Sequence, residues 1–357
     1  MQYQPAGRAL MVRRLLLVVV LALGVASVAA PAHAAKPYRQ GLVATVDATS
    51  TNSVVNHVII HSNWRDLESA DQAWVSTGWN RIANMLSANP SLRFSLRIFT
   101  GGEAPSFVKN LGGGCINVTN PTAGITECVP RFWLSAYQTE WRELIVEVAR
   151  RFGSNARFLD VVNNACTTVF AENFIIGNDP ASVDRLANAG LNETTHRDCL
   201  NRTMNDQQNA LSPSGTRTST ATHNTWQIVV KDAGGGGHIE LSWPKERTVL
   251  NNWHNTYGDM LIVQNNGKSA NEFCLPGQAL STASSLYCWM ATRSHKSPPP
   301  NNAIGFQLGG VSTIAEAADA TQEAADMGAC FVESAVGRLN NLPNRNAVDN
   351  QLEATCP

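Results

Sequence analysis

Residues 54–66 read VVNHVIIHSNWRD, an apolar run that ends in the polar stretch HSNWRD. Three further short apolar runs end in the same way: 94–99 is followed by TGGE, 158–162 by NN and 260–263 by QNN. Runs of this length, separated by amphipathic helices, predict the strands of a parallel sheet. Polar residues after many parallel strands are typical of a (β/α)8 barrel, whose sites lie at the C-terminal ends of its strands. We therefore predict an α/β fold, a single TIM barrel with a polar site at its mouth.

The other elements can be placed around these four runs. Helical spacing of apolar residues predicts helices over residues 71–86 and 141–152. Further helices are expected over residues 104–111, 181–210, 248–256 and 313–327. Residues 304–308 and 329–332 are predicted as strands seven and eight. The third strand is expected near residues 116–118 and the fifth over 226–230, with 239–243 as its alternative. Residues 36–53 are expected to be a polar lead into the first strand.

The N-terminal segment, residues 1–34, has the composition of a secretory signal peptide. Arg13 and Arg14 form a basic region, residues 15–28 an apolar core, and Ala32-His33-Ala34 fits the small-residue cleavage rule. The alternative is an uncleaved membrane anchor, although the apolar core is short for crossing a bilayer. We expect a mature chain of residues 35–357 that is exported from a bacterial cell and is extracellular or associated with the cell wall.

The charge of the mature chain argues against a nucleic-acid partner. Residues 1–34 contain three of the 27 Lys and Arg residues and no acid, so 24 basic residues face 28 acidic ones and the formal charge is −4. No basic cluster remains to bind phosphates. No later stretch is apolar enough to cross a membrane. We expect a monomer with a carbohydrate partner, an oligo- or polysaccharide.

Eight cysteines in an exported chain indicate disulfides. Their spacing suggests that neighbours pair, although sequence leaves the connectivity open; the suggested pairs are Cys115 with Cys128, Cys166 with Cys199, Cys274 with Cys288, and Cys330 with Cys356. The chain has no Cys-x-x-Cys pair and no His-Glu-x-x-His motif, so neither a metal nor another cofactor is predicted.

Several motifs resemble those of barrel-fold glycoside hydrolases. Residues 64–68 (WRDLE) resemble the Trp-x-x-Leu-Glu opening of these enzymes, and residues 96–105 (LRIFTGGEAP) their second strand and loop. Residues 132–152 resemble their third helix. Residues 161–175 are similar to a subgroup of bacterial secreted proteins of that superfamily to which no activity is assigned. The resemblance covers nearly the whole mature chain, and it implies a TIM barrel that acts on carbohydrate.

Glycoside hydrolysis needs two carboxyl groups, an acid and a base or nucleophile. Glu172, after strand four, is the candidate acid/base. In the related enzymes this glutamate directly follows an asparagine at the strand end, whereas here Asn163 and Asn164 occupy the strand end and Glu172 lies further on. The alternative for Glu172 is a glutamate at a helix start, where the helix dipole favours it.

Strand seven departs from the family pattern. The resemblance implies a glutamate nucleophile at its end, but the chain has Gln307, and an amide cannot ionise. Glu333, at the end of strand eight, is the nearest substitute carboxylate; its alternative is a buried structural acid paired with an arginine such as Arg97. The loss of the nucleophile also supports a second hypothesis, a barrel that binds carbohydrate without cleaving it.

Other candidate substrate-binding residues follow the predicted strands. Trp64 could stack on a sugar ring or belong to the core. Asp66 and Arg97 could line the site or pair with each other beneath it. The candidates that could bind sugar hydroxyls through an amide are Asn163, Asn265, Asn266 and Gln307, although Asn-Asn-Gly is also an ordinary turn sequence.

Overall fold

We describe a computed structural model of the 357-residue chain, which covers residues 34–47, 55–120, 124–169, 172–173, 175, 179–220, 226–271, 274, 285–294 and 302–356. The predicted leader, except for Ala34, lies outside the described residues. Within these ranges, no helix combines the length and the apolar character that a bilayer span requires.

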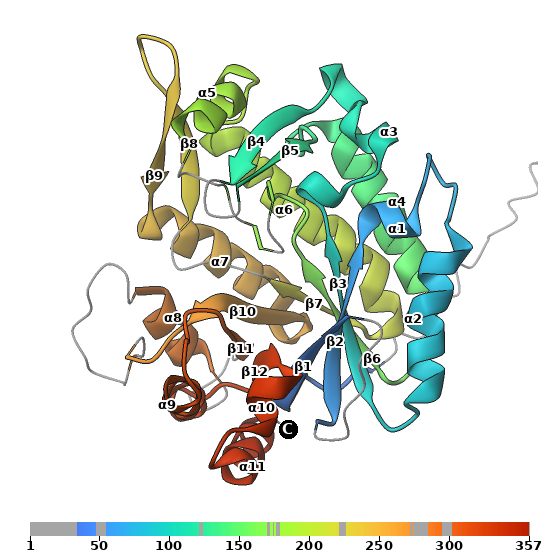
Figure 1. The fold of residues 1–357 in the computed structure, drawn as a ribbon, viewed down its shortest axis with the longest axis vertical. Coiled ribbons are helices and arrows are strands. Elements are labelled where there is room, and N and C mark those ends of the chain that lie inside the picture. Colours follow the sequence, from blue (N-terminus) through green and yellow to red (C-terminus); the bar gives the residue numbers. More distant parts are fainter. Residues whose placement is uncertain are drawn as a thin grey trace, which may run out of the picture. The chain divides into compact units, whose positions relative to one another are not determined.

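Eight parallel strands close into a barrel, which confirms the predicted TIM-barrel fold (Figure 1). Following the barrel round, each strand pairs with the next, and the last, β12, pairs with the first, β1. The strands are β1 (Gly41–Asp47), β2 (His57–Asn63), β3 (Arg93–Phe99), β6 (Phe158–Asn163), β7 (Arg217–Thr220), β10 (Leu261–Lys268), β11 (Ala303–Leu308) and β12 (Phe331–Ala335).

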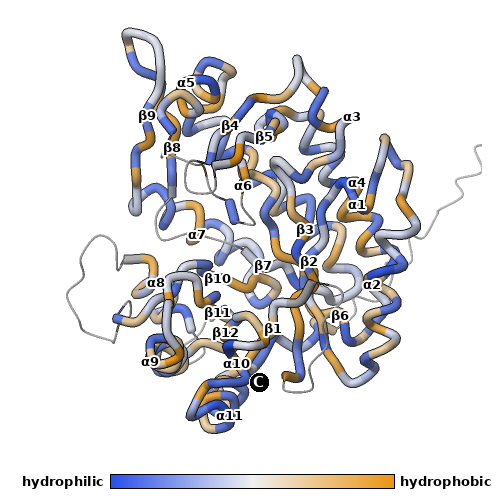
Figure 2. The backbone as a smooth tube through the Cα atoms, in the orientation of Figure 1, coloured by the Kyte–Doolittle hydropathy of each residue, from blue (hydrophilic) through white to orange (hydrophobic). Residues whose placement is uncertain are grey.

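Helices connect the strands and pack around the barrel (Figure 1). The longer ones are α2 (Ser76–Ala88), α4 (Ser135–Phe152), α5 (Pro180–Asn188), α6 (Glu193–Leu211), α7 (Trp243–Tyr257), α8 (Ser285–Arg293), α9 (Ile314–Asp326) and α11 (Arg345–Thr355). The short ones are α1 (Trp64–Leu67), α3 (Ser106–Lys109), α10 (Val336–Asn340) and the 3-10 turns η1 (Gly101–Glu103), η2 (Leu111–Gly113), η3 (Ser212–Ser214) and η4 (Gly258–Met260). In α4 the buried side chains include Trp141, Leu144 and Val148, so one apolar face meets the barrel. Figure 2 shows this mixture of hydrophilic and hydrophobic residues along the helices.

Three strand predictions were wrong. The first barrel strand is β1, inside the segment expected to be a polar lead. The segments expected as strands three and five form antiparallel hairpins instead, β4 (Ile116–Asn120) with β5 (Ile125–Val129) and β8 (Gln227–Lys231) with β9 (Gly237–Leu241). In β4 the buried Ile116 and Val118 flank the exposed Asn117, an alternation typical of a strand with one solvated face.

The fifth barrel strand, β7, was missed because its sequence, RTST, has no apolar residue. All four side chains are nevertheless buried. Arg217 donates to the carbonyl oxygen of Lys36 at 2.9 Å and stacks on the ring of Tyr38, and Thr220 Oγ1 accepts from the backbone N–H of Gln264 at 3.1 Å. Hydrogen bonds to partners distant in sequence thus offset the cost of burying this strand.

The four suggested disulfides are confirmed: Cys115–Cys128, Cys166–Cys199, Cys274–Cys288 and Cys330–Cys356. The first ties β4 to β5, and the last joins the residue before β12 to the end of α11. Crosslinks of this kind stabilise a fold chiefly by restricting the unfolded chain.

Candidate functional site

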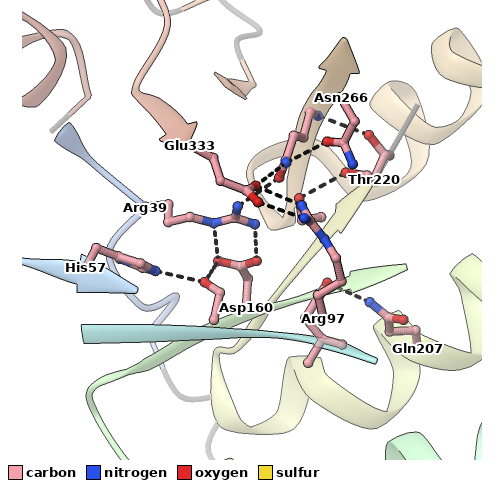
Figure 3. Close-up of polar contacts among 12 residues, drawn as sticks. Arg39, His57, Arg97, Asp160, Gln207, Thr220, Asn266 and Glu333 are labelled. Carbon is pink, nitrogen blue, oxygen red and sulfur yellow. Dashed lines mark hydrogen bonds and ion pairs between the residues drawn. The ribbon is translucent and has the colours of Figure 1, made fainter. Parts of the chain in front are cut away.

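The interior of the barrel contains two buried ion pairs (Figure 3). Arg39, which precedes β1, holds Asp160 of β6 with bonds from Nε to Oδ2 at 3.0 Å and from Nη2 to Oδ1 at 2.5 Å. Arg97 of β3 holds Glu333 of β12 with bonds from Nη1 and Nη2 at 2.7 and 2.8 Å. All four side chains are fully buried. Barrel interiors of this fold are usually filled by branched apolar residues, so four charged side chains in the interior are unusual.

The carboxylate of Glu333 accepts four hydrogen bonds. Besides the two bonds from Arg97, Oε1 accepts from Thr45 Oγ1 at 3.0 Å and Oε2 from Gln264 Nε2 at 2.6 Å. A carboxylate offers about four lone-pair sites, so this one is saturated. Burial alone would raise the pKa of Glu333, but the charge and hydrogen bonds of Arg97, with Arg39 and His61, lower it overall. Glu333 is therefore a carboxylate at neutral pH.

Gln264 connects both ion pairs to the barrel mouth. Its Oε1 accepts from Arg39 Nη1 at 2.8 Å, while its Nε2 donates to Glu333 and, at 2.7 Å, to Asn266 Oδ1. Asn266 Nδ2 in turn donates to Glu172 Oε1 at 3.1 Å. Gln264 and Asn266 lie two residues apart on β10, so both point into the barrel. The amides form a path between two carboxyl groups, Glu172 and Glu333.

Glu172 differs from Glu333 in exposure and in the direction of its pKa shift. Its side chain is partly exposed. Burial raises the pKa of Glu172 and the charge of Glu333 raises it further, while Arg97 and the bond from Asn266 oppose the rise. The environments of the two carboxyl groups thus push their pKa values apart, an arrangement that suits one acid and one base.

A third group of polar residues lies deeper in the barrel. His57 Nε2 is 2.9 Å from Ser95 Oγ, which donates to Asp160 Oδ2 at 2.5 Å. Although these are the residue types of a hydrolytic triad, Ser95 stands between the other two and all three are buried. Ser95 Oγ is engaged by both His57 and Asp160 and has no base that accepts its proton towards a substrate, so the group serves the packing of the barrel.

The structure brings together four of the predicted site residues: Arg97, Asn266, Glu172 and Glu333. Arg97 pairs with Glu333, as in the structural alternative for that glutamate, and not with Asp66. Gln307 of β11 is partly exposed and lies beside Glu333 in register.

The predicted stacking role of Trp64 does not fit the structure. Its side chain is fully buried against Tyr137 and Trp141, and its Nε1 donates to Glu68 Oε2 at 2.8 Å. A ring enclosed in this way has no free face for a sugar. Trp64 belongs to the core, which was the alternative.

The remaining predicted residues are held by other partners. Asp66 accepts from Asn63 Nδ2 at 3.2 Å and lies 4.0 Å from Arg81. Asn265 accepts from the Tyr287 hydroxyl at 3.1 Å. Asn265 and Asn266 are part of β10, so the alternative of an ordinary turn does not apply. Asn163 ends β6; its buried Nδ2, like both amide atoms of Asn164, has no hydrogen-bond partner.

Sequence reasoning missed several residues of this network: Arg39, Thr45, His61, Asp160 and Gln264. Some of them had a signal in the sequence. Polar residues at alternate positions of apolar strands, such as Ser95 and Arg97 or Gln264 and Asn266, occupy the same face of their strand. Arg39 and Thr45 carried no such signal, because they lie in the segment expected to be a polar lead.

Among the described residues, the carboxylates that could together hold a cation lie outside this hydrogen-bond network. Oxygens of Glu68, Asp71 and Glu140 lie within 4.8 Å of one another. Both oxygens of Glu68 already accept hydrogen bonds, from Trp64 Nε1 and from the backbone N–H of Gln72. Burial and the neighbouring carboxylates raise the pKa of Glu140 to about 7. A proton on Glu140 therefore reduces the repulsion in this cluster.

Comparisons with known proteins place the chain only by fold. No family model matches it, and no curated protein matches it. Three solved structures to which the chain is similar share little sequence identity with it. Endo-glycoceramidase II from Rhodococcus sp. is 14% identical with a TM-score of 0.48, and the match covers 84% of this chain and 75% of that one. Old Yellow Enzyme from Pichia sp. AKU4542 is 12% identical with a TM-score of 0.47 and coverages of 90% and 88%. Exo-beta-1,4-mannosidase Op5Man5 from Opitutaceae bacterium strain TAV5 is 10% identical with a TM-score of 0.45 and coverages of 86% and 54%.

Proposed function

We propose that this chain is an exported bacterial glycoside hydrolase with a two-carboxylate mechanism. Glu172 is the general acid/base, and Glu333 is the nucleophile or general base. One observation carries the proposal: the hydrogen-bonded path Glu172–Asn266–Gln264–Glu333 joins two carboxyl groups whose pKa values are shifted in opposite directions. The resemblance at residues 64–68 and 96–105 supports carbohydrate as the substrate.

The chemistry assigns each carboxyl a separate step. Glu172, whose pKa is raised, donates its proton to the oxygen of the leaving group. Glu333, held ionised by Arg97, attacks the anomeric carbon or activates a water molecule. Because Glu333 is fully buried and all its lone pairs are used, Gln264 or Thr45 must first move away to expose a lone pair to the substrate. We propose that the substrate takes over one of these partners when it binds.

The decisive experiment compares the wild type with Glu172→Gln on activated aryl glycosides. The amide keeps the bond from Asn266 to the side-chain oxygen but cannot donate an acidic proton, so turnover should be abolished while binding is largely retained. Glu193→Gln, which changes a partly exposed glutamate paired with Lys245, is the matched control and should behave like the wild type. Full activity of Glu172→Gln would refute the assignment.

A barrel that binds carbohydrate without cleaving it is the second candidate. The saturation of Glu333 and the presence of Gln307 favour it, since neither side chain offers a free carboxylate to the reaction. Gln307→Glu tests it, because the new carboxylate would be partly exposed beside Glu333. An inert wild type together with measurable hydrolysis by Gln307→Glu supports the binding function. Hydrolysis by the wild type that depends on Glu172 excludes it.

A further inference from the structure

His61 lies at the barrel mouth beside the ion pair of Arg97 and Glu333. It occupies the C-terminal half of β2, in register with Arg97, and its Nε2 is 3.3 Å from Arg97 Nη1. The ring meets Phe99 edge-on at a centroid distance of 4.9 Å. Arg97 and Glu333 are fully buried, but His61 is partly exposed. It is therefore the member of this group that a ligand at the mouth can reach without displacing another side chain.

Arg97 determines which ring nitrogen carries the proton. A guanidinium has donors and no acceptor, so His61 Nε2 must accept the hydrogen bond and must be unprotonated. The proton of the neutral ring is then on Nδ1. Burial and the charge of Arg97 lower the pKa of His61 to about 4, against the opposing effect of Glu333, so the neutral ring persists at neutral pH.

The Nδ1–H group of His61 remains available as a donor. Two other histidines have a buried ring nitrogen without a partner, Nδ1 of His57 and Nε2 of His196, but Nδ1 of His61 is not enclosed in this way. Within the described part of the chain, no residue accepts a hydrogen bond from it. A partly exposed donor of fixed orientation beside the proposed catalytic carboxylate suits an oxygen of the ligand.

We propose that His61 contacts the ligand, donating a hydrogen bond from Nδ1 to a hydroxyl or ring oxygen of an uncharged sugar. Arg97 is the positioning residue that fixes the tautomer. The donor is uncharged, and both Nη atoms of Arg97 are already bonded to Glu333, so the group offers a hydrogen bond to a hydroxyl but no free cation to a carboxylate. This inference rests on the proposed function, since it takes carbohydrate as the ligand.

Two substitutions distinguish the roles of the two ring nitrogens of His61. A glutamine places its amide near the position of Nε2, so His61→Gln keeps an acceptor for Arg97 and loses the donor at Nδ1. An asparagine places its amide near Nδ1, so His61→Asn keeps the donor for the ligand and loses the bond to Arg97. Affinity would be measured by calorimetry on the mature chain with four uncharged disaccharides: lactose, cellobiose, mannobiose and N,N′-diacetylchitobiose.

For the disaccharide that binds best, we expect His61→Gln to lose about tenfold in affinity and His61→Asn to stay within about threefold. A ¹⁵N-histidine spectrum of the wild type at neutral pH should show a ring with protonated Nδ1 and bare Nε2, absent in His61→Gln. Wild-type affinity of His61→Gln, or a proton on Nε2, overturns the inference. If none of the four sugars binds, the ligand assignment fails together with the proposed function, and the spectrum still decides whether Arg97 fixes the ring. Sugar binding that is unaffected by His61→Gln leaves the function standing and refutes only the role of His61.

Discussion

Single residues of the barrel interior act through partners, and Arg97 with Glu333 is the clearest case. Removing two charged side chains from water costs free energy. The attraction between the two charges, with additional hydrogen bonds, offsets that cost only when the geometry is good. Two bonds between the partners and two more to Glu333, from Thr45 and Gln264, provide that geometry. Losing one partner leaves the other as an uncompensated buried charge.

We therefore expect Arg97→Met to lose about 3–5 kcal/mol of unfolding free energy, because Glu333 stays buried without its counter-ion. The double variant Arg97→Met/Glu333→Leu should recover most of this loss. Urea denaturation with the disulfides intact, followed by tryptophan fluorescence, measures both variants. A double variant as unstable as the single one would contradict this account.

The buried carboxyl group of Glu246 should make the stability of the folded protein depend on pH. It is buried on α7 and accepts a bond from the backbone N–H of Trp226 at 2.9 Å, and burial raises the pKa of Glu246 to about 8. The folded state therefore holds the proton more tightly than the unfolded state, whose carboxyl has a pKa of about 4.3. The stability contribution is complete below the unfolded pKa and is lost as the pH rises towards 8.

Glu246→Gln should abolish this loss, since the amide still accepts the bond and does not ionise. We expect equal melting temperatures for variant and wild type at pH near 4, and a higher one for the variant at pH near 9, with a difference in unfolding free energy on the order of a few kcal/mol. Calorimetric scans at the two pH values test this. Parallel pH profiles would show that Glu246 is not the responsible group.

At the scale of elements, β11 and β12 fit together because Gly305 has no side chain. A Cβ at this position would lie 2.0 Å from the ring of Phe331, which also stacks beneath the guanidinium of Arg39 at 4.3 Å. This contact places Gln307, two residues further along β11, beside Glu333. The close approach of Phe331 to Gly305 is therefore compatible with the register that sets Gln307 opposite Glu333.

Gly305→Ala should destabilise the fold by about 1–3 kcal/mol, because the added methyl group overpacks a buried ring. Gly337→Ala is the matched control: the glycine lies in α10 and its Cβ would meet no atom within 4 Å. The control should be neutral or stabilised by up to about 1 kcal/mol. Thermal unfolding of both variants tests this prediction. Equal losses of stability would mean that the contact with the Phe331 ring is not the cause of the destabilisation.

At the scale of the whole molecule, the two ends of the described chain are both fastened to the barrel. Lys36 Nζ donates to the carbonyl oxygens of Gly153 and Asn155 and to Thr216 Oγ1 at 2.6, 3.2 and 2.8 Å. At the other end, Cys356 is bonded to Cys330 across 26 residues. Both attachments remain if the chain is cleaved after Ala34.

Replacing Cys330 and Cys356 by alanine should cost about 2–4 kcal/mol of unfolding free energy, because the unfolded chain gains the freedom of an open loop. The Cys115–Cys128 pair, which closes 13 residues instead of 26, should cost less when it is replaced in the same way. Denaturation of the two double variants gives the comparison. A larger loss for the shorter loop would point to local packing of the hairpin as the main effect.

The sequence by itself determined the barrel and six of its strands, and it suggested the disulfide pairs that the structure contains. Apolar runs, helical spacing and cysteine spacing are local patterns, and each is visible within a few tens of residues. Local patterns also misled. β4 is a strand, as its alternation indicates, but it belongs to a hairpin and not to the barrel. β7 is a buried barrel strand although its sequence is polar.

Only the tertiary structure decided which polar residues form the site. Arg97 and Glu333 are 236 residues apart, and Arg39 and Asp160 are 121 apart, so no local pattern relates the partners. The energy of a buried charge depends on what surrounds it in space. The sequence therefore named Glu172, Glu333, Asn266 and Arg97 and left open whether Arg97 pairs with Glu333 and whether Trp64 belongs to the core. The barrel decided both questions and determined that Gln264 joins Glu333 to Asn266.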